Sequence, residues 1–226
     1  MTHVIFGGSN GIGKRIINTF LTNTNDGLIN IDLNQHDFGS RCQNITGDLT
    51  SKEFEKNLLN SLEKVKLESI VWSIRAKVNA KSTSNAIKDC LSIEFYPLVD
   101  IFDLLLPKII QDNTNIVILS SIAAELVSAQ HCAYNITKSA VETFVKTQSV
   151  RIGKVSKARI NIVRPGVVHI QERSKMLDLD VQRNILEQSS IPRLSPVKAE
   201  EIAELVFFLS SNKSSALNGS IVVADG

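Results

Sequence analysis

The fold of this 226-residue chain is decided by its N-terminal stretch, His3-Val4-Ile5-Phe6-Gly7-Gly8-Ser9-Asn10-Gly11-Ile12-Gly13. A short run of strand character leads into a glycine-rich turn, after which apolar residues recur at helical spacing from Ile12 to Leu21. Glycines let a backbone turn tightly and approach a pyrophosphate, and the amides at a helix N-terminus attract anions. The stretch therefore predicts a strand, a phosphate-binding turn and a helix, although a tight turn without a ligand would have the same glycines.

The alternation of short strands and longer helices continues to the C-terminus. After the first strand, β-branched runs predict six more, at 28–32, 43–46, 69–73, 116–120, 159–163 and 220–223. Apolar residues at helical spacing predict further helices near 52–65, 84–111, 133–153 and 198–210. Parallel strands need crossover connections, so we expect an α/β fold with one doubly wound parallel sheet of about seven strands. The whole chain, 1–226, is expected to be one domain, with a substrate lid near 167–195.

Composition and charge exclude several classes of protein. The chain is 43% hydrophobic and 21% charged, as in ordinary globular domains, and its net charge of +2 gives no electrostatic reason to bind nucleic acid or an anionic membrane. No apolar run approaches the ~18 residues of a membrane span. The three cysteines, Cys42, Cys90 and Cys132, form no CxxC pair, so neither disulfides nor a metal site is indicated. We expect a cytoplasmic protein with no nucleic-acid, membrane or metal partner.

Two aspartates follow predicted strands at one edge of the sheet. Asp32 ends the second strand about twenty residues after the glycine turn, where a carboxylate can accept hydrogen bonds from the adenosine ribose of a dinucleotide. Because a carboxylate would repel a 2′-phosphate, NAD is favoured as the cofactor, with NADP possible. Asp48, followed by Leu49, ends the third strand and is expected beside the adenine.

A tyrosine and a lysine lie four residues apart, at Tyr134 and Lys138, and so share one face of a predicted helix. An ammonium beside a phenol stabilises the phenolate, which lets the phenol exchange a proton in neutral solution. The spacing is frequent in proteins and is also typical of an exposed helix pair. Its interpretation therefore depends on the rest of the pattern.

Taken together, these residues resemble the short-chain dehydrogenase/reductase family from end to end. Gly7, Gly11 and Gly13 match its glycine motif, and the pair Tyr134 and Lys138 matches its Tyr-x-x-x-Lys. The run 116–121 looks like the strand that ends in the family's catalytic serine. Family spacing places that serine thirteen residues before the tyrosine, which selects Ser121 over its neighbour Ser120. Arg164-Pro165-Gly166 resembles the Pro-Gly after strand six, and 191–226 resembles the closing segment.

The resemblance implies a Rossmann-like fold and an NAD(P)(H)-dependent oxidoreductase that interconverts a secondary alcohol and a ketone on a small molecule. Ser121 would bond the substrate oxygen, Tyr134 would transfer the hydroxyl proton, and Lys138 would bind the nicotinamide ribose. A homodimer or homotetramer is expected, in which helix residues such as Leu104 and Val141 could be core or interface. The cofactor site is expected to comprise Gly7, Ser9, Asn10, Gly11, Ile12, Gly13, Asp32, Asp48, Leu49, Ser73, Tyr134, Lys138, Pro165, Gly166 and Val168.

Three departures from the family pattern affect this interpretation. Trp72-Ser73-Ile74-Arg75 stands where the family has Asn-Asn-Ala-Gly; we expect Arg75 to be a solvated loop charge, the alternative being that it reaches a phosphate or an anionic substrate. Glu94, or Ser92 if the alignment shifts, stands where a family asparagine links the lysine to water. Glu94 is taken as a catalytic residue that serves the same proton relay, or as a partner that pairs with Lys138. Ile170 replaces a threonine beside the nicotinamide.

These departures leave two other functions open. One is a nucleotide-binding protein without dehydrogenase activity, acting as a regulatory or assembly subunit. The other is a non-redox enzyme on the same scaffold, such as an epimerase or dehydratase. The intact Ser121, Tyr134 and Lys138 favour the oxidoreductase.

Overall fold

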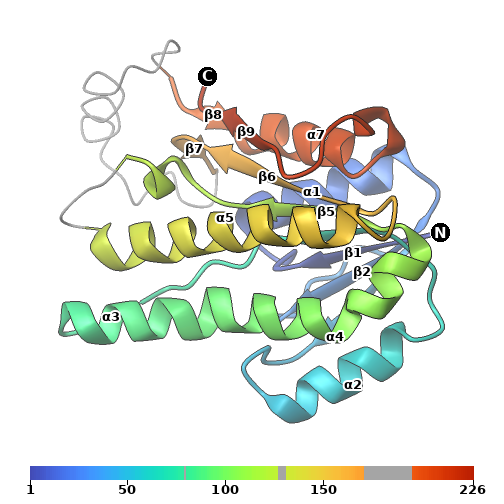
Figure 1. The fold of residues 1–226 in the computed structure, drawn as a ribbon, viewed down its shortest axis with the longest axis horizontal. Coiled ribbons are helices and arrows are strands. Elements are labelled where there is room, and N and C mark those ends of the chain that lie inside the picture. Colours follow the sequence, from blue (N-terminus) through green and yellow to red (C-terminus); the bar gives the residue numbers. More distant parts are fainter. Residues whose placement is uncertain (79, 127–130, 171–194) are drawn as a thin grey trace.

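The computed structural model describes residues 1–78, 80–126, 131–170 and 195–226. Its centre is a sheet of seven parallel strands in the order β3-β2-β1-β4-β5-β6-β9 (Figure 1). The predicted doubly wound parallel sheet is therefore confirmed, and most strand boundaries lie within two residues of those predicted. The strands are β1 (Thr2–Phe6), β2 (Gly27–Asp32), β3 (Cys42–Thr46), β4 (Leu67–Trp72), β5 (Asn115–Leu119), β6 (Arg159–Pro165) and β9 (Ile221–Ala224).

The order of the strands reverses beside β1. This strand pairs with β2 on one side and with β4 on the other. Strands β2 and β3 therefore extend the sheet on one side of β1, and β4, β5, β6 and β9 extend it on the other side. In open parallel sheets the connections diverge at such a point, leaving a crevice outside the carboxyl ends of the two strands where ligands bind. The glycine turn after β1 and Ser73 after β4 both lie at this point.

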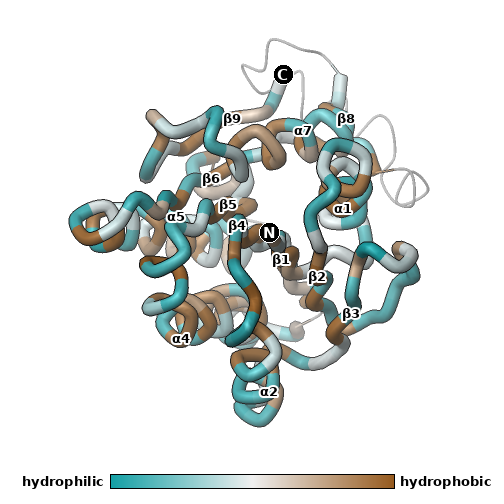
Figure 2. Tube along the Cα trace, turned by 90° about the vertical axis from the view of Figure 1, so that its right-hand side faces the viewer, coloured by the Kyte–Doolittle hydropathy of each residue, from teal (hydrophilic) through white to brown (hydrophobic). Residues whose placement is uncertain are grey.

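Helices cover both faces of the sheet. One core cluster packs α1 and α7 against the strands, and a second packs α2, α4 and α5 against the other face (Figures 1 and 2). Figure 2 shows the hydrophobic residues gathered along the strands and on the helix sides that face them. These helices are α1 (Gly11–Asn23), α2 (Lys52–Leu62), α4 (Tyr96–Asp112), α5 (Cys132–Gly153) and α7 (Ala199–Leu209).

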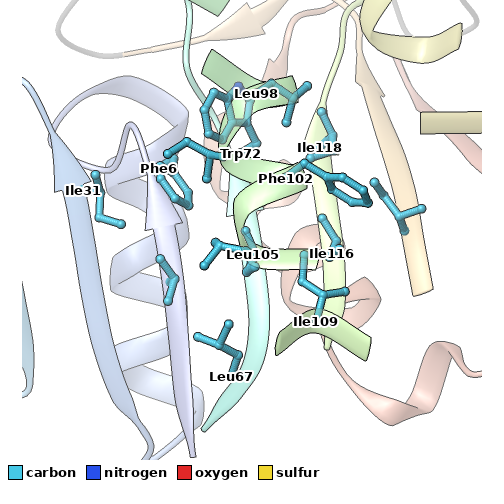
Figure 3. Close-up of a cluster of buried hydrophobic side chains, with 14 of the residues drawn as sticks. Phe6, Ile31, Leu67, Trp72, Leu98, Phe102, Leu105, Ile109, Ile116 and Ile118 are labelled. Carbon is cyan, nitrogen blue, oxygen red and sulfur yellow. The ribbon is translucent and has the colours of Figure 1, made fainter. Parts of the chain in front are cut away.

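Large side chains at the centre of the sheet make the core beneath α4. Phe6 and Trp72, from adjacent strands, stack with their ring centroids 4.7 Å apart, and Phe102 and Leu105 of α4 pack over the same cluster (Figure 3). Every residue of β5 is buried. Strands with both faces covered read as continuous apolar runs, and such runs located the central strands in the sequence. Each large side chain that is fully buried contributes about 1.5–3 kcal/mol.

The predicted helix at 84–111 is interrupted, which corrects the sequence interpretation. α3 (Thr83–Cys90) runs into a π-helical turn, η1 (Leu91–Phe95), before α4 begins. Pro97 has no amide hydrogen with which to continue an α-helical ladder, and the Tyr96 amide instead donates to the carbonyl of Leu91, five residues back. The wide turn carries Glu94 into the interior.

The helix residues that sequence left between core and interface are mostly core. Val141 is 2% exposed and packs in the cluster with α4, whereas Leu104 is 41% exposed. Homo-oligomerisation stays a prediction. Among the described residues, the helices are all too short or too polar to cross a membrane.

The expected lid near 167–195 begins and ends in a small second sheet. β7 (Val168–His169) pairs in parallel with β8 (Val197–Lys198), and the Val197 amide donates to the carbonyl of Val167 at 2.9 Å. The remainder of the expected lid, 171–194, lies outside the described residues.

His3 links stability to pH. Its ring lies in β1, 5% exposed, with Nδ1 2.8 Å from Ser69 Oγ and Nε2 3.4 Å from Asp26. Burial lowers the pKa of His3 below its ordinary value, and the attraction of Asp26 only partly opposes this. In weak acid the unfolded chain therefore binds a proton on His3 more readily than the folded protein does. The contribution of His3 to the free energy of unfolding is fully present above about pH 6.5, and it is lost as the pH falls through the lower pKa that His3 has in the folded protein.

We expect the free energy of unfolding to decrease between pH 7 and pH 5, and the decrease to be smaller in His3→Gln. Urea denaturation at several pH values measures both slopes. Equal slopes in the two proteins would contradict this assignment.

Candidate active site

The glycine turn packs directly against the ends of two strands. The Gly7 amide donates to the carbonyl of Ile31 at 2.8 Å, and a β-carbon on Gly7 would lie 2.9 Å from the backbone of Ser73. A β-carbon on Gly13 would lie only 2.0 Å from the carbonyl oxygen of Gly7. Helix α1 can therefore begin this close to β1 only because these positions lack side chains.

The start of α1 is suited to an anion. Asn10 is exposed and makes no side-chain cap, and no acidic residue occupies the first turn. Among the described residues, a β-carbon on Gly11, whose φ is +55°, would meet only the tip of Ile170 at 3.5 Å. Ile12 is partly buried against the cluster beneath α1. Amides without a side-chain cap and without an acidic neighbour at a helix N-terminus fit the pyrophosphate of a dinucleotide.

Asp32 is held at the end of β2 by backbone amides. Its two carboxylate oxygens accept from the amides of Ser9 and Asn34, each at 2.9 Å. Ser9 itself is buried, and its hydroxyl donates to the carbonyl of Asn34 at 2.6 Å while accepting from Asn30 at 3.1 Å. The Ser9 side chain thus supports the turn, whereas each oxygen of Asp32 has further capacity to accept a hydrogen bond.

Two neighbouring residues after β3 have different surroundings. Asp48 is exposed and accepts hydrogen bonds from both the amide and the hydroxyl of Thr50, at 2.9 and 2.8 Å. The Leu49 side chain is 8% exposed and packs in the core. Of these two residues, Asp48 is the one that offers a polar side chain at this edge.

The segment 73–76 joins the glycine turn to the predicted catalytic residues. The Ser73 amide donates to the carbonyl of Phe6 at 2.9 Å, and the Ala76 amide donates to Glu94 Oε1 at 2.8 Å. Between them, the Arg75 guanidinium lies over the ring of Tyr134, with Cζ 5.1 Å from the ring centroid. Arg75 is exposed, as expected of a solvated loop charge, and its guanidinium also makes a cation–π contact with the tyrosine.

Lys138 and Glu94 form a buried ion pair. Nζ lies 2.7 Å from Glu94 Oε2, and the side chains are 5% and 1% exposed. The contact lacks the direction of a hydrogen bond, and Nζ instead donates to the carbonyl of Leu119 at 3.2 Å. The same Nζ lies 5.6 Å from the centroid of the Tyr134 ring. Of the two candidates, Glu94 therefore faces the lysine, whereas Ser92 is exposed and bonds the carbonyl of Asp89.

The two serines after β5 differ in what their hydroxyls do. Ser120 is buried and donates to Glu142 Oε1 at 2.8 Å. Ser121 is half-buried and accepts from the Ala123 amide at 3.2 Å, which leaves its own hydroxyl hydrogen available. Only Ser121 therefore has a free donor, as the family spacing predicts for the catalytic serine.

Glu142 and Arg164 anchor this region, and the sequence interpretation missed them. Nε and Nη2 of Arg164 donate to the two oxygens of Glu142 at 3.0 and 2.6 Å, and Nη1 also bonds Glu125. These bonds to Glu142 raise the pKa of the Arg164 guanidinium above its ordinary value. The available signal was that Glu142 follows Lys138 by four residues and so shares its inward face.

The residues after β6 lie beside the same crevice edge. Pro165 is the last residue of β6, and the Gly166 amide donates to the carbonyl of Ala224 at 3.0 Å. Val168 is partly buried against the cluster beneath α1 and α7. Among the described residues, no group of three or more potential metal ligands occurs, and the three cysteines are free.

Comparisons with known proteins identify relatives along the whole chain. The family model described as enoyl-(acyl carrier protein) reductase matches residues 20–226. The uncharacterised oxidoreductase YmfI of Bacillus subtilis is 26% identical over 245 residues, covering 100% of this chain and 97% of that protein. The 3-oxoacyl-[acyl-carrier-protein] reductase FabG of Buchnera aphidicola is 25% identical, covering 100% of this chain and 96% of that protein.

Solved structures agree on the fold. A short-chain dehydrogenase family protein of Francisella tularensis superposes with a TM-score of 0.82 at 24% identity, covering 100% of this chain and 97% of the other. A 3-oxoacyl (acyl-carrier-protein) reductase of Agrobacterium tumefaciens with NADP bound gives 0.86 at 20% identity, covering 100% and 93%.

The buried pair of Lys138 and Glu94 leads to a prediction about stability. Glu94→Gln leaves a buried ammonium and Lys138→Met a buried carboxylate, each without its counter-charge, and each change should cost roughly 3–5 kcal/mol. The double variant should cost clearly less than the sum, as measured by urea denaturation.

The exposed pair Arg151 and Asp103 provides the matched control. Its atoms are 3.1 Å apart, but the side chains are 53% and 56% exposed, so its removal should cost less than about 1 kcal/mol. If the double variant of Glu94 and Lys138 lost as much stability as the two single variants together, the predicted coupling between the two residues would be contradicted.

Proposed function

The chain belongs to the short-chain dehydrogenase/reductase family, and on that premise we propose that it is an NAD(H)-dependent oxidoreductase that interconverts a secondary alcohol and a ketone on a small molecule. The observation that carries the proposal is the position of Tyr134 and Lys138. Both lie beside segment 73–76, which leads back to the glycine turn at the point where strand order reverses. Ligands bind at that point in open parallel sheets.

The residues present fit a dinucleotide. Uncapped amides at the start of α1 would hold the pyrophosphate, and Asp32 would accept from the adenosine ribose. When bound, the nicotinamide would supply or accept the hydride. The protein's own contribution is to bind, orient and exchange a proton.

The proton moves through Tyr134. In the reducing direction the Ser121 hydroxyl donates to the carbonyl oxygen of the substrate, and Tyr134 gives that oxygen its proton as it becomes a hydroxyl. The Lys138 ammonium stabilises the phenolate that remains. Glu94 balances the charge of Lys138 and holds the loop through the Ala76 amide, which keeps both groups in place. Reversal of these steps oxidises an alcohol.

Tyr134→Phe tests this mechanism. The change keeps the ring but removes the exchangeable proton, so turnover should fall by at least about a hundredfold while NADH binding survives. NADH consumption is followed with a panel of ketones, sugars and 3-oxoacyl thioesters, and NADH binding by fluorescence.

Ser120→Ala is the matched control for Ser121→Ala. It removes a hydroxyl that is occupied by Glu142, so it should lower stability but keep turnover, whereas Ser121→Ala should lower turnover. Full activity of Tyr134→Phe with any substrate would require another proton donor.

The preference for NAD rests on the carboxylate of Asp32. A fixed negative charge at the end of β2 would repel a 2′-phosphate, although the Agrobacterium reductase was solved with NADP bound. NADH should bind at least about tenfold more tightly than NADPH in fluorescence titrations, and Asp32→Asn should narrow that ratio. Tighter binding of NADPH by the unaltered protein would refute the preference.

A further inference from the structure

Arg75 is a charged group beside Tyr134 that the proposed mechanism does not use. It follows β4 in the segment 73–76, is exposed, and lies with Cζ 5.1 Å from the centroid of the Tyr134 ring. A guanidinium held over an aromatic ring by a cation–π interaction still has its N–H groups as hydrogen-bond donors. Arg75 therefore presents several donors beside the proton-transferring residue.

Arg75 has no direct ion-pair partner within the described part of the chain. No carboxylate there forms an ion pair with it, whereas the neighbouring Lys138 is paired with Glu94 and Arg164 with Glu142. Of the described cations that contact the Tyr134 ring, Arg75 is therefore the one without a direct counter-ion. The planar fork of a guanidinium matches a carboxylate or a phosphate, to which it donates two parallel hydrogen bonds.

The phosphates of the cofactor do not account for this cation. The pyrophosphate fits the start of α1, and a 2′-phosphate would lie near Asp32 at the end of β2, which pairs with β1 on the side away from β4. Arg75 follows β4 and contacts Tyr134, on the side where the substrate reacts. An anion bound there belongs to the substrate.

We propose that Arg75 forms a subsite for an anionic group of the substrate, a carboxylate or a phosphate, borne by the molecule whose carbonyl meets Tyr134. The inference rests on the proposed oxidoreductase function and deepens it. Its substrates would be oxo acids or oxo phosphates and the corresponding hydroxy compounds, in which the anion lies within a few bonds of the reacting carbon.

Ligand-observed NMR in the presence of NAD⁺, with which a ketone cannot react, tests the subsite without requiring turnover. The probes are pyruvate, acetoacetate and levulinate, whose carboxylates lie at increasing distance from the ketone, each beside its neutral methyl ester. Dihydroxyacetone phosphate beside dihydroxyacetone tests the phosphate. The proteins are the unaltered chain, Arg75→Met, and Lys77→Met as a control that removes an exposed cation two residues away.

We expect at least one anion to bind more tightly than its neutral partner, roughly ten- to hundredfold more weakly to Arg75→Met, and unchanged to Lys77→Met. The anionic probe that binds decides between carboxylate and phosphate. The subsite is overturned if no anion exceeds its neutral partner, or if Arg75→Met leaves anion binding unchanged. It is also overturned if Arg75→Met weakens NADH or NADPH binding, because Arg75 would then serve the cofactor.

A parallel assay of NADH consumption with the same probes separates the two proposals. Reduction of neutral ketones with no preference for acids would support the oxidoreductase and overturn the subsite. Arg75-dependent anion binding without reduction of any probe or of the wider ketone panel would support the subsite and count against the oxidoreductase.

Discussion

The close approach of helix α1 to strand β1 is the constraint on which the rest of the site depends. With only 2.0 Å between the position of a Gly13 β-carbon and the Gly7 carbonyl oxygen, any side chain would push the helix away from the sheet. In its present place, α1 directs its uncapped amides past the end of β1, and Gly7 packs against the backbone of Ser73. The carboxyl ends of β1 and β4 and the start of segment 73–76 are thereby held together.

The pairing of buried charges at the site determines which chemistry its residues can support. A lysine that is 5% exposed would be costly without a counter-charge, and Glu94 supplies one from the π-helical turn that precedes Pro97. The same carboxylate fixes the Ala76 amide, so the loop that carries Arg75 is tied to the lysine that faces Tyr134. Two departures from the family pattern, at Arg75 and at Glu94, are therefore parts of one arrangement.

A second polar network lies next to the candidate serine. Glu142 of α5 bonds both Arg164 of β6 and Ser120 at the end of β5, so three elements are joined beneath the candidate serine. Because Ser120 gives its hydroxyl hydrogen to this network, Ser121 alone keeps one to donate to a substrate. The network therefore leaves the two adjacent serines, Ser120 and Ser121, with different hydrogen-bonding capacity.

The sequence by itself determined the seven parallel strands, the glycine turn, the helical pairing of Tyr134 with Lys138 and the family. Each of these depends on local spacing or on a run of buried apolar residues. Only the tertiary structure decided that Glu94 rather than Ser92 meets Lys138, that the Arg75 guanidinium lies over the Tyr134 ring, and that the helix at 84–111 contains a π-turn. Glu94 and Lys138 are 44 residues apart, and periodicity places a residue on a face without saying which distant side chain that face will meet. Such contacts are set by how helices and loops pack across the sheet.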